Sequence, residues 1–428
     1  MLHKNRFLLT SLSVLALAFS SFGQVAKSPY STFGLGDTYG NSLAQNQGMG
    51  GVGISNPSPW YISNQNPALL TANYVTSFQA GLILESRTVN DGSSSLKNGS
   101  GNLNYLVMAF PIKPGKWTTS LGLMPYSSVN YKLSQVLPVE GSNTSTYLDQ
   151  KTGSGGINQF YWANGVKIHK YVSLGVRASY LFSSIINEEV NVLNQPDNRL
   201  VAYYASKYER NYVKDLSFSV GSYFHLDSLF KKNYRFNVGL VYGFKSSLST
   251  QRTLRQEERS IRGSIVDSVT LINNEPGSIT LPQTLGLGIS FGRVNHWTVG
   301  ADLNLLDYNQ FKGFTGASSS PATTGVKSAL GFEYIPDPTG IGNYLKRMTY
   351  RTGVSYERYP YLVGGNQVKD LGVNFGVSLP VGRLSTLDLS LKIGKRGVAS
   401  ENIIEENYFK LYFGMTFNDQ WFIKRKFD

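Results

Sequence analysis

The stretch that decides the fold is LGVNFGVSL at residues 371–379, because apolar residues alternate strictly with small or polar ones along it. Two later stretches repeat the pattern, LDLSLKIG at 387–394 and YFKLYFGMTF at 408–417. A β-strand points successive side chains to opposite faces, so this period of two predicts strands with one apolar and one polar face. From Tyr74 onward the period recurs along the chain.

We predict about fourteen antiparallel strands from this pattern, which makes the chain an all-β protein. The gaps between them alternate between long and short, as in the outer loops and periplasmic turns of a membrane barrel. The exception is 336–348 (PDPTGIGNYLKRM), which we interpret as a turn with a short helical piece. The expected strands are 74–88, 102–112, 117–133, 156–168, 171–185, 212–226, 233–248, 283–292, 296–309, 325–335, 349–358, 369–380, 385–395 and 406–418.

The first residues have the layout of a secretory signal. A short basic start is followed by an apolar run over 7–19 and by Ser21 and Gly23, at positions −3 and −1 of a cut before Gln24. This layout predicts a signal peptide over 1–23 that is removed on export. The alternative is a membrane helix, but the run is shorter than the roughly twenty residues that a bilayer needs.

The composition agrees with a closed barrel in the outer membrane. No other stretch reaches the roughly eighteen apolar residues of a membrane helix, so a barrel is the spanning structure that remains. The chain has 44 Gly, 27 Tyr and 23 Phe, and only 16% of its residues are charged. Because Cys is absent, disulfides, thiolate metal sites and thiol nucleophiles are excluded.

The chain carries a formal net charge of +13, which falls to +11 when Lys4 and Arg6 leave with the signal. In an exported barrel we attribute this excess to anionic lipid and anionic ligands rather than to nucleic acid. Outer-membrane lipid and lipopolysaccharide are therefore expected partners, and a nucleic acid is not.

The residues between the signal and the first strand form a different kind of segment. Residues 24–73 are rich in Gly, Ser, Asn and Pro and show no sustained alternation, yet they are too aromatic and apolar for a disordered chain. We expect a compact, loop-rich segment that packs on another part of the protein. The expected organisation is a signal peptide (1–23), this segment (24–73) and one barrel domain (74–428).

The N-terminal motifs resemble a known family. Gly-Met-Gly-Gly at 48–51 is followed by Asn66-Pro67-Ala68 and by a first strand containing TSFQAGL (76–82). This order resembles the FadL family of outer-membrane transporters for hydrophobic compounds. Four further stretches look like the versions of that family in Bacteroidetes-type bacteria: SLGLMPYSSVNY (120–131), HWTVGADLNLLDYNQF (296–311), YRTGVSYERYPY (350–361) and the closing NDQWFIKRKFD (418–428).

The resemblance implies a fold and a route. In the FadL family the N-terminal segment forms a hatch inside a fourteen-stranded barrel, which here assigns a hatch to residues 24–73. Asn66, Pro67 and Ala68 carry over as its motif. The ligand passes from an outer groove to a site in the lumen, and it leaves sideways through a kink in strand three.

Pro125 gives an independent reason for a kink in the third predicted strand. Proline cannot donate to a β-ladder, and a closed barrel has no edge to hold it, so pairing must be interrupted there. Gly122 lowers the cost of bending beside it. From the residues alone, a lateral gap and an ordinary turn between two short strands both remain open, and the resemblance favours the gap.

The predicted lumen faces carry glycines and charges, and each set has two readings. The glycines (Gly175, Gly221, Gly239, Gly300, Gly353, Gly372 and Gly394) permit close approach of a plug, or they relieve crowding in a curved sheet. The cations form an anion-binding site for a carboxylate head group, or a structural network with lumen acids that holds the hatch. These cations are Arg177, Arg235, Lys327, Arg351, Lys392 and Lys410, and the acids are Asp302, Glu333, Glu357 and Asp388.

Catalysis finds no support in the motifs. Neither Gly-x-Ser-x-Gly nor His-Glu-x-x-His occurs, and His169, His225 and His296 are scattered. We expect no enzyme, no cofactor and no metal. The expected function is passive uptake of a hydrophobic or amphipathic, fatty-acid-like molecule across the outer membrane, with lateral or periplasmic release. The alternatives are a FadL-like accessory barrel of a type IX protein-secretion translocon and a general diffusion porin.

Overall fold

The computed structural model describes residues 26–141, 145–194, 203–229, 233–314, 322–339, 342–381, 385–398 and 404–419. The predicted signal peptide at 1–23 lies outside these ranges, as does most of the closing stretch at 418–428.

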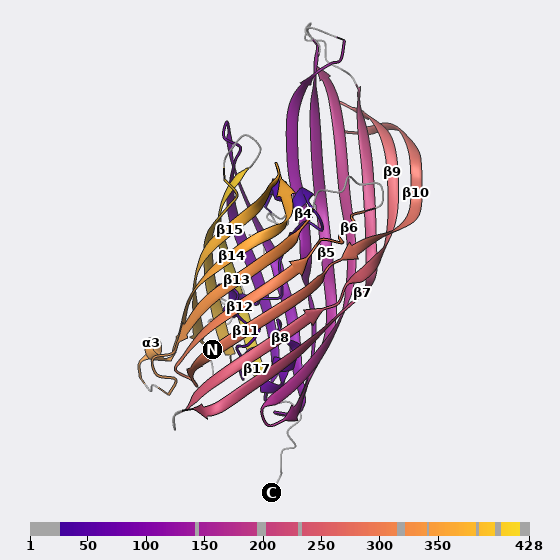
Figure 1. Cartoon of the computed structure of the whole chain (residues 1–428). Coiled ribbons are helices and arrows are strands. Elements are labelled where there is room, and N and C mark those ends of the chain that lie inside the picture. Colours follow the sequence, from indigo (N-terminus) through magenta and orange to yellow (C-terminus); the bar gives the residue numbers. More distant parts are fainter. Residues whose placement is uncertain are drawn as a thin grey trace, which may run out of the picture.

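Fourteen antiparallel strands of the described chain close into a barrel (Figure 1). Each strand pairs with the next along the chain, and β17 returns to pair with β2 from Glu405↔Asn90 to Asp419↔Thr76. Two of the fourteen are interrupted, because β8 continues as β9 and β10 continues as β11. The predicted all-β barrel of about fourteen strands is confirmed. Its strands are β2 (Thr76–Asn90), β3 (Ser95–Lys113), β4 (Trp117–Pro138), β5 (Thr146–His169), β6 (Val172–Asn194), β7 (Tyr203–Leu229), β8 (Tyr234–Gly243) with β9 (Ser246–Ser260), β10 (Ile265–Leu281) with β11 (Gln283–Arg293), β12 (Trp297–Asp307), β13 (Thr324–Tyr334), β14 (Thr349–Val363), β15 (Asn366–Pro380), β16 (Ser385–Arg396) and β17 (Glu405–Asp419).

The apolar face of the strands points outward. On β15 the side chains of Leu371, Val373 and Phe375 are 55%, 41% and 51% exposed, whereas Asn374 between them is fully buried. A soluble protein would bury the apolar residues instead, so the outer face is suited to hydrocarbon and the lumen to polar groups. Among the described residues, no helix is long and apolar enough to cross a membrane.

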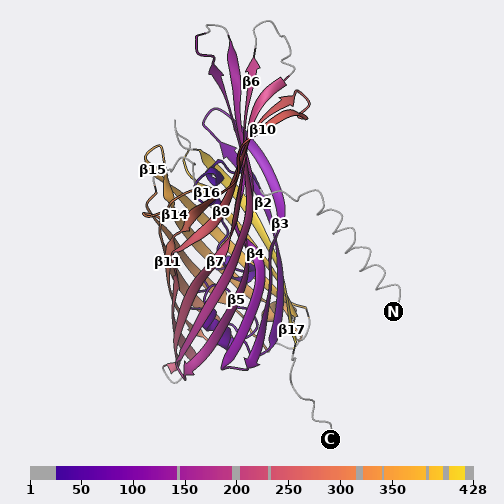
Figure 2. The ribbon, with the colours of Figure 1, turned by 90° about the vertical axis from the view of Figure 1, so that its right-hand side faces the viewer.

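Part of the wall rises well above the rest (Figures 1 and 2). β7 has 27 residues, whereas β12 on the other side has 11. β4 to β7 and the β9–β10 hairpin form this raised sheet, so the strand ends predicted at 133, 156, 185 and 212 fall short. The loop predicted between 248 and 283 is wrong, because most of β9 and all of β10 occupy it. In this raised sheet polar residues stand on both faces, and some of them, such as Ser206 and Glu257, are buried. The apolar alternation that revealed the other strands is therefore lost there.

The two ends of the barrel differ. Strands join through short turns at one end, which we call the short-turn end, and through longer connections at the other, which we call the long-loop end. The exception at the short-turn end is 335–348, which contains the single-turn helix α3 (Tyr344–Arg347). Its cap, Asn343, accepts a hydrogen bond from the Leu345 backbone N–H at 3.1 Å. The expected short helical piece is confirmed.

Residues 26–75 precede β2 and lie within the barrel; we call them the N-terminal segment. They contain η1 (Pro29–Thr32), the two-residue β1 (Asp37–Thr38), α2 (Ala44–Gln47) and η2 (Pro67–Ala72). The largest buried apolar cluster joins Leu43, Ile62 and Leu70 of this segment to wall residues such as Val107 and Tyr105. The core of the protein therefore lies between the segment and the inner wall of the barrel.

Candidate functional site: the filled lumen

Glycines of the wall make room for the N-terminal segment. A Cβ placed on Gly175 of β6 would lie 2.3 Å from the Pro67 carbonyl carbon, and one on Gly353 of β14 would lie 2.3 Å from that of Met49. No side chain fits at such distances. The wall glycines that meet the segment in this way include Gly165, Gly175, Gly221, Gly239, Gly288, Gly300, Gly331, Gly353 and Gly376, which we call the glycine belt.

Many members of the belt sit side by side across the strands. Gly165 pairs with Gly175, which pairs with Gly221, and Gly331 pairs with both Gly300 and Gly353. Of the seven glycines singled out in the sequence, five belong to the belt. Gly372 and Gly394 face the side chains of Lys392 and Tyr408 instead. At Gly175, Gly239 and Gly353 the backbone of the segment approaches closely, and at Gly221 and Gly300 its side chains Asn66 and Val52 do so.

Asn66, Pro67 and Ala68 lie against this belt where η2 begins. The Asn66 amide nitrogen donates to the backbone carbonyls of Ile54 at 2.9 Å and Ser222 at 3.0 Å. Its oxygen accepts from the Ala68 backbone N–H at 3.0 Å and caps η2. Pro67 occupies the first position of η2, where no amide donor is needed. The three residues thus form one turn that fixes the segment to β7.

Polar side chains of the wall hold the rest of the segment by its backbone. The Asp302 carboxylate accepts from the backbone N–H groups of Gly53 at 2.7 Å and Ile54 at 2.9 Å. Asn374 donates to the Gln47 carbonyl at 2.8 Å, and Ser390 donates to the Ala44 carbonyl at 2.7 Å. These contacts satisfy the backbone of a loop that lies away from water.

A buried cluster of ion pairs ties Asp37 of the segment to the wall. The Asp37 carboxylate lies 3.4 Å from Arg87 of β2 and 2.8 Å from Arg396 of β16. Glu406 of β17 pairs with both guanidinium groups, at 2.7 and 3.4 Å. Burial alone would raise the pKa of Asp37, but Arg396 and Arg87 outweigh it and hold this pKa below its usual value of 3.8. Asp37 is therefore a charged anchor of the segment at neutral pH.

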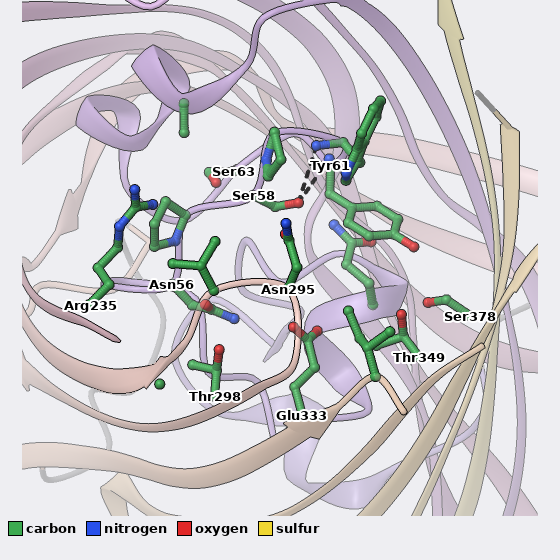
Figure 3. A pocket seen from close by; sticks show the side chains of 18 of the residues that line it. Asn56, Ser58, Tyr61, Ser63, Arg235, Asn295, Thr298, Glu333, Thr349 and Ser378 are labelled. Atoms are coloured by element: carbon green, nitrogen blue, oxygen red, sulfur yellow. Dashed lines mark hydrogen bonds between the residues drawn. The ribbon is translucent and has the colours of Figure 1, made fainter. Parts of the chain in front are cut away.

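Two cavities lie on opposite sides of the segment. The long-loop cavity has a volume of about 350 Å³ and is lined by the Asp37 cluster and by tyrosines such as Tyr39 and Tyr126. The short-turn cavity has a volume of about 690 Å³. Figure 3 looks into it and shows Arg235 and Glu333 projecting from the wall, with Asn56 and Ser58 contributed by the segment. Residues 45–56 line both cavities, so a thin part of the segment separates them.

The six predicted anion-binding cations do not form one site. Lys327, Lys392 and Lys410 line the long-loop cavity, whereas Arg235 and Arg351 line the short-turn cavity. Five of the six are ion-paired, to Asp227, Glu357, Glu333, Asp370 and Glu85. Arg177 contacts the Asn64 side-chain oxygen and the Tyr161 ring instead. The structure thus divides these six residues between separate places and pairs five of them, and anion binding by any of them stays a prediction.

The wall is interrupted beside Pro125. β3 and β4 pair from Lys113↔Trp117 to Leu106↔Leu123, and in the described part of the chain they do not pair beyond that point. β4 also has a bulge towards β5 between Pro125 and Ser127. Gly122 lies below the break in regular pairing, where its missing side chain leaves room for the Tyr161 ring.

The N-terminal segment occupies the gap above the break. β1 pairs with β4 at Thr38↔Ser127, and the Ser28 backbone N–H donates to the Asn130 carbonyl at 2.8 Å. On the other side of the gap, the Lys27 backbone N–H donates to the Asn98 side chain of β3 at 2.8 Å. Residues 27–39 therefore bridge β3 and β4, and we call them the lateral seal. The kink position was predicted, but the lateral seal was not.

Sequence reasoning also missed Asp37, Arg87, Arg396 and Glu406. Arg87 and Glu406 stand 319 residues apart, and pairing across such a distance leaves no local pattern. One signal was available: both residues occupy polar positions near the long-loop ends of predicted strands that become neighbours once the barrel closes.

Comparisons with known proteins agree with this architecture. The sequence model of the BamG family matches residues 2–428, and no curated protein sequence matches the chain. The Pseudomonas putida toluene transporter TodX is similar at 15% identity and a TM-score of 0.58, over 90% of this chain and 99% of that one.

Two further solved structures are similar. The Ralstonia pickettii toluene transporter TbuX has 13% identity and a TM-score of 0.54, over 89% of this chain and 98% of that one. A FadL homologue from Pseudomonas aeruginosa has 12% identity and a TM-score of 0.56, over 90% and 99%. At these identities the likeness concerns the fold, which is the FadL-type barrel.

Proposed function

The chain belongs to the BamG family, and on this premise we propose that it carries hydrophobic or amphipathic, fatty-acid-like molecules passively across the outer membrane. In this proposal the predicted signal peptide exports the chain, the apolar outer face contacts lipid and lipopolysaccharide, and the long-loop end faces outward. The N-terminal segment acts as the hatch expected from the sequence.

The observation that carries the proposal is the pair of cavities separated by residues 45–56 of the segment. Ligand sites in proteins have volumes of about 300–1,000 Å³, and both cavities fall in that range. A molecule held in the long-loop cavity reaches the short-turn cavity only if the segment moves. TodX and TbuX are toluene transporters, which supports a hydrophobic ligand here.

Two exits are consistent with the geometry, and different parts of the segment close them. The lateral seal (27–39) closes the β3–β4 gap, which adjoins the long-loop cavity through Thr38 and Tyr126. The rest of the segment closes the way to the short-turn cavity. A neutral molecule can leave through the gap into hydrocarbon, but a charged head group cannot, because burying an unpaired charge in an apolar medium is costly. Neutral molecules therefore take the lateral exit and anionic ones the periplasmic exit.

Uptake by whole cells tests the proposal. We expect cells that produce the chain to accumulate radiolabelled 1-decanol and decanoate faster than cells that lack it, with outer-membrane levels checked by heat-modifiable migration on a denaturing gel. Native mass spectrometry of the purified protein should also reveal retained lipophilic molecules. Equal accumulation by both cell types would refute the uptake function.

The raised sheet favours a second candidate, an accessory barrel of a protein-secretion translocon. β4 to β7 and the β9–β10 hairpin project beyond the long-loop ends of the other strands. The proposed uptake of lipophilic molecules does not require this projection. Residues 265–271 of β10 are exposed throughout, and β10 pairs only with β9 in the described residues. Such an edge can accept another strand. Co-purification of the full chain with a large secretion complex, lost when 249–281 is replaced by a short Gly-Ser turn, would support this candidate.

The third sequence-based alternative, a general diffusion porin, agrees less well with a lumen filled by residues 26–75. Ion conductance in planar bilayers separates the two readings. A hatch predicts little current for the full chain and a large current after deletion of 24–73, because the strands can close without it. A porin predicts current in both.

A further inference from the structure

The two cavities differ in how well their charges are compensated. The long-loop cavity is lined by five Lys or Arg side chains and five carboxylates. The short-turn cavity is lined by four Lys or Arg side chains and two carboxylates. Of these four cations, Arg351 is paired with Glu333 at 2.7 Å, and Arg235 is paired with Asp227. The excess of positive charge therefore lies on the remaining lysine and arginine, Lys167 and Arg347.

Lys167 lies in one corner of the short-turn cavity, with His225 and Arg235. Lys167 of β5 is the register partner of Ser173 on β6, which in turn is the register partner of Tyr223 on β7. Neighbouring strands lie about 4.8 Å apart. The next inward position on β7 after Tyr223 is His225, which stacks on the Tyr223 ring at 5.2 Å. Asp227 lies 3.5 Å from His225 and pairs with Arg235. Four side chains from three strands thus converge on one wall of the cavity.

This corner has unused capacity to bind an anion. Among the described residues, Lys167 has no carboxylate partner, and Asp227 is the single acid for both Arg235 and His225. His225 is 7% exposed, and its Nδ1 has no hydrogen-bond partner. The Nδ1 atom itself is closed off from the cavity, so the capacity of the corner rests on the unpaired Lys167 and on the single acid that Arg235 and His225 share.

We infer that the corner formed by Lys167, His225 and Arg235 binds the anionic head group of an amphipathic molecule, either a carboxylate or a phosphate. Lys167 supplies the charge, and its ammonium supplies charge-assisted hydrogen bonds to the head-group oxygens, while His225 and Arg235 line the corner beside it. The apolar chain extends along Trp60, which lines the same cavity.

The position of the corner connects it to the hatch. Gly165, Gly175 and Gly221, against which Pro67 and Asn66 pack, lie one inward position away from Lys167, Ser173 and Tyr223 on the same strands. The Thr71 hydroxyl at the end of η2 contacts the Ser173 hydroxyl at 3.0 Å. A head group bound at the corner therefore lies directly beside the turn that holds the segment. The inference rests on the proposed function. It adds that the ligands which leave by the periplasmic exit are anionic amphipathic molecules.

Binding by the purified full chain tests the inference with three probes that share a ten-carbon chain: 1-decanol, decanoate and decyl phosphate. The dissociation constants would be measured in lipid nanodiscs at neutral pH. We expect at least one anionic probe to bind about tenfold more tightly than decanol, as one charge-assisted contact implies. The better anion identifies the source as a free acid or a phosphate-bearing lipid.

Two variants locate the preference. Lys167→Gln should bring the anionic probes to within about twofold of decanol, whereas Lys167→Arg should keep most of the preference. The matched control is Lys327→Gln, which removes a cation that Glu357 pairs at 2.9 Å in the other cavity; it should leave the preference unchanged. Heat-modifiable migration would check that each variant folds.

The outcomes separate this inference from the proposed function. If decanol binds but neither anion binds more tightly, the head-group site is refuted and the uptake of hydrophobic molecules stands. If Lys327→Gln abolishes the preference as fully as Lys167→Gln does, the corner is also refuted. If none of the three probes binds, the proposed function fails and the inference fails with it.

Discussion

The side-chain amide of Asn66 donates a hydrogen bond of 3.0 Å to the backbone carbonyl of Ser222 on β7. The same amide also donates to the Ile54 carbonyl, so one buried side chain joins two parts of the N-terminal segment to the wall. The Asn-Pro-Ala turn therefore attaches the segment to the wall. The hatch proposal depends on how stable this attachment is.

Replacing Asn66 should loosen the segment without harming the barrel. Asn66→Ala leaves two carbonyls and the Ala68 N–H without their partners, at a cost of about 1–3 kcal/mol for each buried group. We expect faster hydrogen exchange over residues 54–72, with unchanged exchange in β14 to β17. Asn56→Ala is the control, because the Asn56 side chain makes a weak hydrogen bond to the Met49 sulfur at 3.6 Å. Equal exchange in the two variants would contradict the attachment.

The glycine belt makes a sharper prediction, because a single methyl group should displace the segment. In Gly175→Ala the new Cβ would meet the Pro67 backbone at 2.3 Å, and neither backbone can yield. In Gly372→Ala it would meet the flexible end of the Lys392 side chain at the same distance. We expect Gly175→Ala to raise ion conductance in planar bilayers severalfold and Gly372→Ala to leave it low. An inserted Gly175→Ala barrel that stays closed would show that the segment does not depend on the belt.

Pro125 should matter for neutral ligands. Pro125→Val restores an amide donor and a residue that favours strands, which promotes regular pairing of β4 beyond Leu123. We expect a barrel at least as stable on heating, with slower uptake of 1-decanol, unchanged capture from outside and unchanged uptake of decanoate. If the stably inserted variant takes up decanol at the parental rate, the lateral route is excluded.

Acidification should release the segment in a narrow range. Because Arg396 and Arg87 lower the pKa of Asp37 in the docked state, its contribution is fully present above the usual value of 3.8 and is lost as pH falls below it. Protease access to residues 26–75 should be flat from about pH 8 to 5 and rise below about pH 4. Asp37→Asn should raise access at neutral pH and flatten the profile. A profile identical in both proteins would remove Asp37 from the anchoring cluster.

The strands could be predicted from the sequence because lipid and lumen impose opposite chemistry on alternate side chains. The alternation of Leu371, Val373 and Phe375 with small or polar residues predicts their strand in this way. The same reasoning failed at 249–281, where polar residues such as Arg255 and Glu258 stand on both faces of a hairpin and break the alternation. The part of each strand that lies in the membrane could therefore be predicted from the sequence. The length by which a strand extends beyond the membrane could not.

The sequence predicted which types of residue face the lumen, but it did not predict which residues contact one another there. Glycines at Gly175 and Gly353 indicated close backbone approach, yet nothing local to them names Pro67 or Met49 as the partner. The ion pairs of Arg87 with Asp37 and Glu406 join residues far apart in the chain. The lateral seal rests on the two residues of β1 and a few backbone hydrogen bonds, which no side-chain pattern encodes.

The central claim is that molecules pass only when the N-terminal segment moves, and two engineered disulfides test it. The chain has no cysteine of its own. Thr71→Cys with Ser173→Cys joins side chains whose hydroxyls are 3.0 Å apart and locks η2 to β6. Thr38→Cys with Ser127→Cys joins register partners and locks the lateral seal to β4. Each lock alone shows which exit a probe uses.

The decisive measurement is uptake of 1-decanol and decanoate by cells that carry both locks, before and after treatment with a reductant, with cells that produce the unsubstituted chain as the control. We predict that both probes enter the oxidised cells no faster than cells without the chain, and that reduction restores entry of both. Parental uptake through a barrel shown to carry both disulfides would contradict the claim, because molecules would then pass a segment that cannot move.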